Sequence, residues 1–195
     1  MGQRLNIEIH SGDNVLANAY YHWSGYTRSS IELAKRIVAD HDKVQEENQT
    51  LRAIRLLELT GARLTNVEIE HAKSVGLDNQ FEPADSRNAG LIAISEKGMA
   101  ETQLWEEARV TIDLADNTVT FDALWSYSKE EYVDNYSQEE YEKLGEWSHD
   151  QDPTEPMSFE ALDAFSQYID DTIDGGSYTL KFTKDDEPSV VGFIE

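Results

Sequence analysis

The chain has 195 residues, of which 39% are apolar and 10% aromatic, so it can bury a core and is too apolar for a disordered acidic tail. It has no cysteine, which excludes disulfides, thiolate zinc sites and cysteine nucleophiles. Its net charge of −23 disfavours direct binding of nucleic acid and of anionic membranes. Because neither a signal-peptide pattern nor a membrane-length apolar run occurs, we expect a soluble, cytoplasmic protein.

Two strands are predicted at the start of the chain. Residues 4–9 alternate apolar and polar side chains, and residues 15–23 follow a Ser-Gly-Asp-Asn turn, so we expect a hairpin. The second strand ends in the densest aromatic segment of the chain, residues 20–26, called the aromatic cluster below. It can form a stacking pocket with a histidine as acid or base, or its alternate side chains can pack under the sheet and along its rim. The pocket hypothesis uses Tyr20, His22, Trp23 and Tyr26.

Three helices are predicted next. Ser29 and Glu32 have the spacing of a capping box, which predicts a helix that starts at Ser29. A second helix runs from Leu51 to a stop at Gly61, and residues 67–75 form a short third helix. Three arginines give this region a modest basic patch, which either binds the acidic half of a second copy in a homodimer or is a solvated helix face: Arg52, Arg55 and Arg63.

The middle of the chain is predicted to contain further β-strands. Residues 77–88 read as a loop, residues 90–94 as a central strand, and residues 96–98 as a turn. The strand at 90–94 and two further strands, within 102–114 and over 118–124 and joined by a tight turn at 115–117, suggest an antiparallel meander. Carboxylates on its solvent side are expected to extend an acidic surface: Glu101, Glu106, Glu107, Asp113 and Asp122.

These elements, with a closing pair of strands at 178–182 and 190–194, predict an α+β fold. We expect a single domain over residues 1–195, in which a mainly antiparallel sheet packs against several helices. A subdivision near residues 77–88 is the alternative, because the charge balance changes there.

The negative charge is concentrated in the second part of the chain. Residues 1–75 carry nine basic and ten acidic residues, whereas residues 76–195 carry seven basic and twenty-nine acidic ones, a net of −22. Capping boxes at 128–131 and 137–140 predict two short helices or one kinked helix. Apolar residues spaced by three and four predict a further helix from Phe159 to Ile173. The exposed faces of these helices form the predicted acidic face: Glu130, Glu131, Asp134, Glu139, Glu142, Glu146, Glu160, Asp163, Asp170, Asp171 and Asp174.

Like charges three or four residues apart destabilise a helix by about 0.2–0.5 kcal/mol per pair, so the acidic face calls for an explanation. Adaptation to salt would spread acidity over the whole chain, and solubility would need no partner. The third explanation is docking on a basic protein surface. Its most specific form is mimicry of DNA, because acidic helix faces approach the charge spacing of a duplex and can occupy the cationic channel of a nuclease.

The opening Met-Gly-Gln-Arg-Leu-Asn-Ile-Glu-Ile, followed by Leu-Ala-Asn-Ala-Tyr-Tyr-His-Trp-Ser, resembles uncharacterised acidic accessory proteins of bacteriophages and prophages. The resemblance covers about the first thirty residues. It implies a counter-defence protein in the host cytoplasm, for example an inhibitor of restriction or CRISPR nucleases.

No catalytic motif is present in the sequence. The five histidines show no metal-ligand spacing, and phosphate-binding, nucleotide-binding and serine-nucleophile motifs are missing. We therefore predict no catalytic residues, no metal site and no cofactor. The alternative function is that of a small hydrolase or ligand-binding protein that uses the aromatic cluster and His22.

Overall fold

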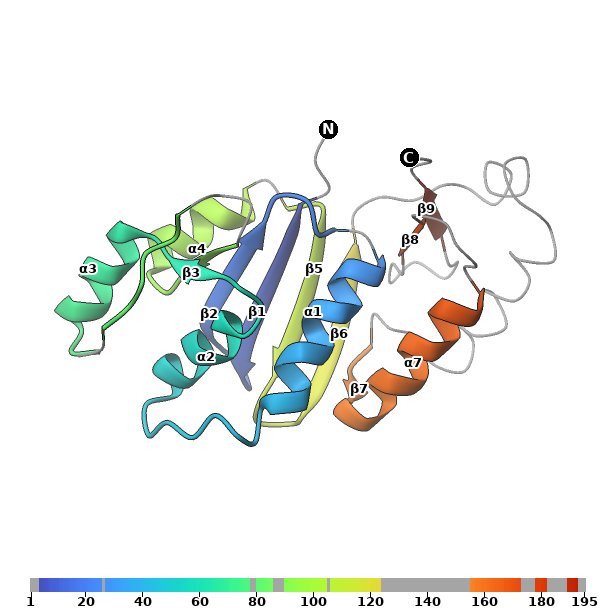
Figure 1. Cartoon of the computed structure of the whole chain (residues 1–195), viewed down its shortest axis with the longest axis horizontal. Helices are drawn as coiled ribbons and strands as arrows, with labels where there is room; N and C mark the ends of the chain where they lie inside the picture. Colours follow the sequence, from blue (N-terminus) through green and yellow to red (C-terminus); the bar gives the residue numbers. More distant parts are fainter. Residues whose placement is uncertain are drawn as a thin grey trace.

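The computed structural model describes residues 4–25, 27–77, 80–85, 90–104, 106–123, 155–172, 178–181 and 189–192. Its main element is a seven-stranded mixed sheet, in the order β3-β4-β2-β1-β5-β6-β7 (Figure 1). The strands of this sheet are β1 (Leu5–Ser11), β2 (Asn14–Tyr21), β3 (Arg63–Leu64), β4 (Leu91–Ala93), β5 (Ala108–Asp113), β6 (Thr118–Ala123) and β7 (Met157–Ser158). A separate antiparallel pair contains β8 (Tyr178–Lys181) and β9 (Ser189–Gly192).

Five helices accompany the sheet in the described residues. They are α1 (Thr27–Asp40), α2 (Gln49–Glu58), α3 (Asn66–Ser74), α4 (Glu96–Gln103) and α7 (Phe159–Thr172). This arrangement confirms the predicted α+β class with a mainly antiparallel sheet. The division of the chain into one domain or two stays a prediction.

The N-terminal hairpin lies in the middle of the sheet. β1 pairs antiparallel with β2 and parallel with β5, so that Ile7 lies opposite Ala19 on one side and Val110 on the other. β5 and β6 form the predicted antiparallel hairpin, with Asn117 at a φ of 54° in its turn. β4, which we expected in a meander with β5, instead pairs with β2 on the far side of the hairpin. The hairpin thus separates β4 from β5.

Alternation along the strands gives the sheet an apolar and a polar face. Leu5, Ile7 and Ile9 are fully buried and share one core with the inward faces of α1, α2 and α7. These helices lie over that face of the sheet (Figure 1). Asn6 and Glu8 point to the opposite face, where α4 packs. The side chains of both residues are buried, so this second face is a polar interior layer near β1 and β2.

The helix boundaries follow capping groups, and two predicted boundaries are wrong. α1 begins at Thr27, two residues before the expected capping box, so Ser29 lies inside the helix. Residues 96–98 are the first turn of α4 and do not form a separate turn, because the Ser95 hydroxyl accepts a hydrogen bond from the Gly98 amide at 3.0 Å. α2 and α3 begin after Asn48 and Thr65, whose side chains accept from the amides of Leu51 and Glu68.

The helix predicted from the spacing after Phe159 is confirmed as α7. Leu162 and Phe165 are buried, and the ring of Phe165 lies 5.3 Å from that of Phe121 on β6. α7 therefore closes the apolar core beside α1. The segment 128–147, predicted to form two short helices or one kinked helix, lies outside the described residues.

Candidate functional site: a cavity at the end of β2

A cavity of about 660 Å³ opens on the polar side of the sheet, between β2, β4, α3 and α4. Its apolar lining includes Val67, Leu91 and Ala93. Its polar lining contains the hydroxyl groups of Tyr20, Thr65, Ser95 and Thr102, the imidazole of His22, and four charged groups, on Arg4, Glu68, Lys97 and Glu101. Its volume lies within the range of about 300–1,000 Å³ that is typical of small-molecule sites.

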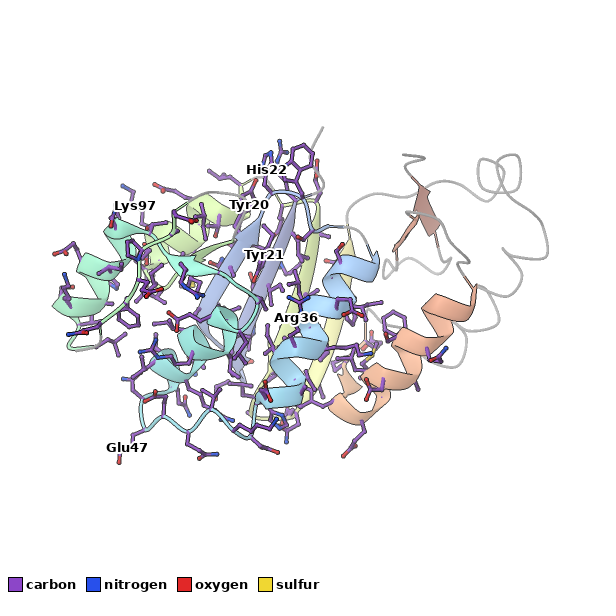
Figure 2. The ribbon with its side chains drawn as sticks, viewed as in Figure 1. Tyr20, Tyr21, His22, Arg36, Glu47 and Lys97 are labelled. Carbon is purple, nitrogen blue, oxygen red and sulfur yellow. The ribbon has the colours of Figure 1, made fainter. Side chains whose placement is uncertain are left out.

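Two members of the aromatic cluster line this cavity. The Tyr20 hydroxyl and His22 Nδ1 form a hydrogen bond of 2.9 Å. Trp23 packs edge-on against the imidazole, with ring centroids 4.8 Å apart, and is 50% exposed. Figure 2 shows Tyr20 and His22 together at one end of the sheet. The structure thus brings together three of the four predicted pocket residues, while Tyr26 lies outside the described part of the chain.

Tyr21 has a different role from its neighbours because strand alternation turns it to the apolar face. It is buried in the core, and its hydroxyl forms a hydrogen bond with Thr60 Oγ1. Burial raises the pKa of the Tyr21 phenol. Gly90 packs against its ring, since a Cβ at that position would lie 2.7 Å from Tyr21 Cε1. The aromatic cluster is therefore divided between a core residue and residues that line the cavity.

Glu68 contributes to the lining of the cavity from α3. Although it is only 3% exposed, its carboxylate is well satisfied: Oε2 accepts from the amides of Ile94 and Ser95 at 2.8 Å, and Oε1 accepts from the Ser95 hydroxyl at 2.6 Å. The negative charge also faces the N-terminus of α4, where the helix dipole stabilises it. Glu68 thus fixes α3 to the junction of β4 and α4.

Two of the cations that line the cavity, Lys97 and Arg4, each lie beside a carboxylate. Lys97 Nζ lies 3.7 Å from a carboxylate oxygen of Glu101, one turn along α4, and both side chains are exposed. Arg4 is half-buried and lies 3.6 Å from Glu107, which also accepts a hydrogen bond from the Arg4 amide at 2.8 Å. The mouth therefore carries two cations, each beside a carboxylate.

A buried polar row continues from the cavity along the same face. Asn18 on β2 donates to Thr102 Oγ1 at 2.9 Å, and Gln103 donates to Glu8 at 2.7 Å. Burial alone would raise the pKa of Glu8, but the hydrogen bond with His10, the charge of Arg109 and the Gln103 amide together hold it below its usual value. These contacts attach α4, and with it one wall of the cavity, to the centre of the sheet.

Most members of the predicted acidic face lie outside the described residues. Glu160 and Asp163 on α7 are exposed, as expected, and Asp163 lies 3.4 Å from Lys35 of α1. Asp170 and Asp171 belong to α7, although only their backbone is described. The other predicted members lie outside the described residues: Glu130, Glu131, Asp134, Glu139, Glu142, Glu146 and Asp174.

The expected extension of the acidic surface over the sheet is wrong for two of its members. Glu106 and Glu107 are half-buried, because each pairs with an arginine of the sheet region. Glu106 binds the guanidinium of Arg109, and Glu107 binds Arg4. Their charges are therefore largely neutralised within the fold.

The predicted basic patch is mostly used inside the fold. Arg52 donates to the carbonyl oxygens of His41 and Val44, at 2.8 and 3.1 Å, and holds the segment between α1 and α2. Arg63 donates to two carbonyl oxygens near the end of α2, and Arg55 pairs with Glu58. Neither predicted role, binding of a second copy or a solvated helix face, describes Arg52, because its guanidinium is used in hydrogen bonds within the fold.

Several residues of the cavity are not predicted as site residues from the sequence, among them Glu68 and Lys97. Glu68 has the spacing of an ordinary carboxylate on a helix, and Lys97 lies in a segment that the sequence predicts as a turn. No sequence pattern therefore identifies either residue as part of a binding site. Within the described residues, no helix is long and apolar enough to cross a membrane, and no group of three or more histidine and acidic side chains could hold a metal ion. Comparison of the chain with protein-family models, curated proteins and solved structures finds no match.

Proposed function

We propose that this protein binds a small organic molecule in the cavity at the end of β2. The observation that carries the proposal is that Tyr20 and His22, joined by a hydrogen bond, line a cavity of about 660 Å³ together with an apolar wall and charged side chains. A concave, partly apolar site with a few convergent polar groups is the usual form of a ligand pocket.

Binding can be tested by recording ¹H–¹⁵N NMR spectra of the full chain with a library of small fragments. Fragments that bind the cavity should shift the amide signals of His22, Ser95 and Gly98 together. Replacing His22 with alanine should weaken this binding, whereas His71→Ala, at a position that does not line the cavity, should leave it unchanged. If no fragment perturbs these signals, the cavity is not a ligand site.

The uneven charge of the chain supports a second proposed function, in which the acidic second half docks on a basic protein. Residues 76–195 have a net charge of −22. In the described part, many cations are already paired with neighbouring carboxylates, among them Arg4, Arg55 and Arg109. In its most specific form, the protein is a DNA mimic encoded by a phage, which inhibits a nuclease or another DNA-binding protein in the host cytoplasm.

The acidic proposal is tested by capturing cytoplasmic proteins on the immobilised chain and eluting them with salt. A basic nucleic-acid enzyme that leaves at moderate salt is expected, because exposed charges are screened within about 8–10 Å at such ionic strengths. Reversing Glu130, Glu131, Asp134, Asp170 and Asp171 to lysine should abolish capture without affecting fragment binding in the cavity. Capture that survives these five substitutions would contradict the acidic proposal.

A further inference from the structure

We infer that the ligand of the cavity is a small organic acid, with its anionic group at Lys97 and His22 and its apolar body against Val67 and Leu91. This inference rests on the proposed ligand-binding function. It follows from asking which of the charged and polar groups around the cavity are still able to bind a ligand.

The buried carboxylate of the cavity is not available to a cationic ligand. Glu68 already accepts three hydrogen bonds, from two amides and the Ser95 hydroxyl, and it faces the positive end of α4. A ligand cation would have to compete with all of these donors in a site that is 3% exposed. Glu68 therefore supports the wall of the cavity and does not select a positive ligand.

Lys97, in contrast, can change partners at little cost. Its side chain is 87% exposed, and the 3.7 Å pair with Glu101 is long and solvated. Exposed pairs of this kind contribute little to stability, so Lys97 can exchange Glu101 for the anion of a ligand. Arg4 adds a second positive charge to the same lining, while Glu107 holds it in position.

His22 offers a second donor to a ligand in the cavity. Its Nδ1 is bonded to the Tyr20 hydroxyl, and its Nε2 has no hydrogen-bond partner in the described part of the chain. In the tautomer in which Tyr20 donates to Nδ1, the proton is on Nε2, which then donates to a ligand oxygen. Tyr20 thus orients the imidazole, and the lining of the cavity contains two donor groups, His22 at the end of β2 beside Tyr20 (Figure 2) and Lys97 on α4.

The remaining lining favours an apolar ligand body. Val67 is 75% exposed although it borders the cavity, and Leu91 and Ala93 line it from β4. Trp23 packs against His22 and adds an exposed aromatic surface next to the imidazole. Covering these surfaces would favour an acid with an aromatic or aliphatic group over a bare inorganic anion.

The test uses three probes that share one ring: phenylacetate, its neutral amide phenylacetamide, and phenyl phosphate. Each is titrated into the full chain, and dissociation constants are taken from the NMR shifts of His22, Ser95 and Gly98. We expect phenylacetate to bind about tenfold more tightly than the amide, because only the acid gains a charge-assisted contact with Lys97. The phenyl phosphate titration determines whether the site prefers a carboxylate or a phosphate monoester.

Two substitutions at the mouth should act in opposite directions. Lys97→Gln should remove the preference for the acid, whereas Glu101→Gln should tighten acid binding about two- to fivefold, because Lys97 loses its competing partner. Lys43→Gln, at an exposed lysine paired with Asp40 outside the cavity, is the matched control and should change nothing.

Equal binding of acid and amide, or an acid preference that survives Lys97→Gln, would overturn the inference. If the acids fail but neutral or cationic fragments still shift the cavity signals, the ligand class is wrong and the ligand-binding function stands. If no fragment of any charge shifts these signals, the proposed function fails as well.

Discussion

The carboxylate of Glu68 on α3 lies directly against the α-carbon of Gly98 in the first turn of α4. A Cβ at position 98 would collide with this carboxylate and would also lie 3.0 Å from the Ser95 hydroxyl oxygen. The contact explains why a glycine, normally unfavourable within a helix, occupies this turn. It also joins α3 and α4 at the wall of the cavity.

Gly98→Ala should therefore lower the free energy of unfolding, by about 1–3 kcal/mol, because Glu68 has to leave its three donors to make room. Urea denaturation of the variant measures the change. The double variant Glu68→Ala/Gly98→Ala is the control, because without the carboxylate the added methyl group should favour the helix. If Gly98→Ala alone stabilises the protein, as helix propensity predicts, the contact has no energetic role.

Glu8 should make stability depend on pH in the acid range. Its pKa in the folded protein lies below the 4.5 of an unperturbed glutamate, so the unfolded chain binds the proton first as the pH falls. The contribution of the Glu8 carboxylate is therefore complete above this value and is lost as the pH falls through the folded pKa. Glu8→Gln should lower stability at neutral pH, and its difference from the parent protein should shrink in acid.

The Glu8 prediction is measured by urea denaturation of both proteins at several pH values from 7 to about 3, within the range over which glutamate titrates. Glu47→Gln, at an exposed position, is the control for the loss of one negative charge from an acidic protein. A stability difference that stays constant with pH would show that the Glu8 charge is not stabilised by its neighbours.

Tyr21 should make the stability of the protein depend on pH in the alkaline range. Because burial raises the pKa of its phenol above 10, the unfolded chain loses the proton first, and the parent protein should lose stability as the pH rises above 10. Tyr21→Phe should be less stable at pH 7 by about 0.5–1.5 kcal/mol, since the bond to Thr60 is lost. It should also show a shallower decline in alkali, which thermal denaturation followed by circular dichroism can measure. Parallel alkaline curves for the two proteins would contradict the assignment.

Arg52 should be more important for stability than its place on a helix surface suggests. Arg52→Lys removes the planar guanidinium group, which donates hydrogen bonds to the carbonyl oxygens of His41 and Val44. A lysine ammonium cannot reproduce this planar geometry. We expect a loss of about 1–2 kcal/mol in the free energy of unfolding. Arg55→Lys, which keeps a cation beside Glu58, should cost less. Equal effects of the two substitutions would show that Arg52 contributes no more to stability than an arginine on a solvated helix face.

The local elements of this protein are determined by the sequence itself. Alternation through Leu5, Ile7 and Ile9 produces a strand with one buried face, and the spacing after Phe159 produces α7, because each pattern gathers apolar groups on one side of a single element. The tight turn before β6 forms where Asn117 tolerates a positive φ. These features depend on residues close together in the chain.

The order of the strands and the cavity are decided only in the tertiary structure. β1 pairs with β5 about a hundred residues later, and no local pattern specifies which strands pair over such a distance. The helix that begins at residues 96–98 has a local cap at Ser95, but Glu68, from another element, binds the amides of Ile94 and Ser95 before it and so fixes its position. Likewise His22 and Lys97 line one cavity only because α4 packs against β2 on one face of the sheet, which brings together side chains that the sequence places far apart.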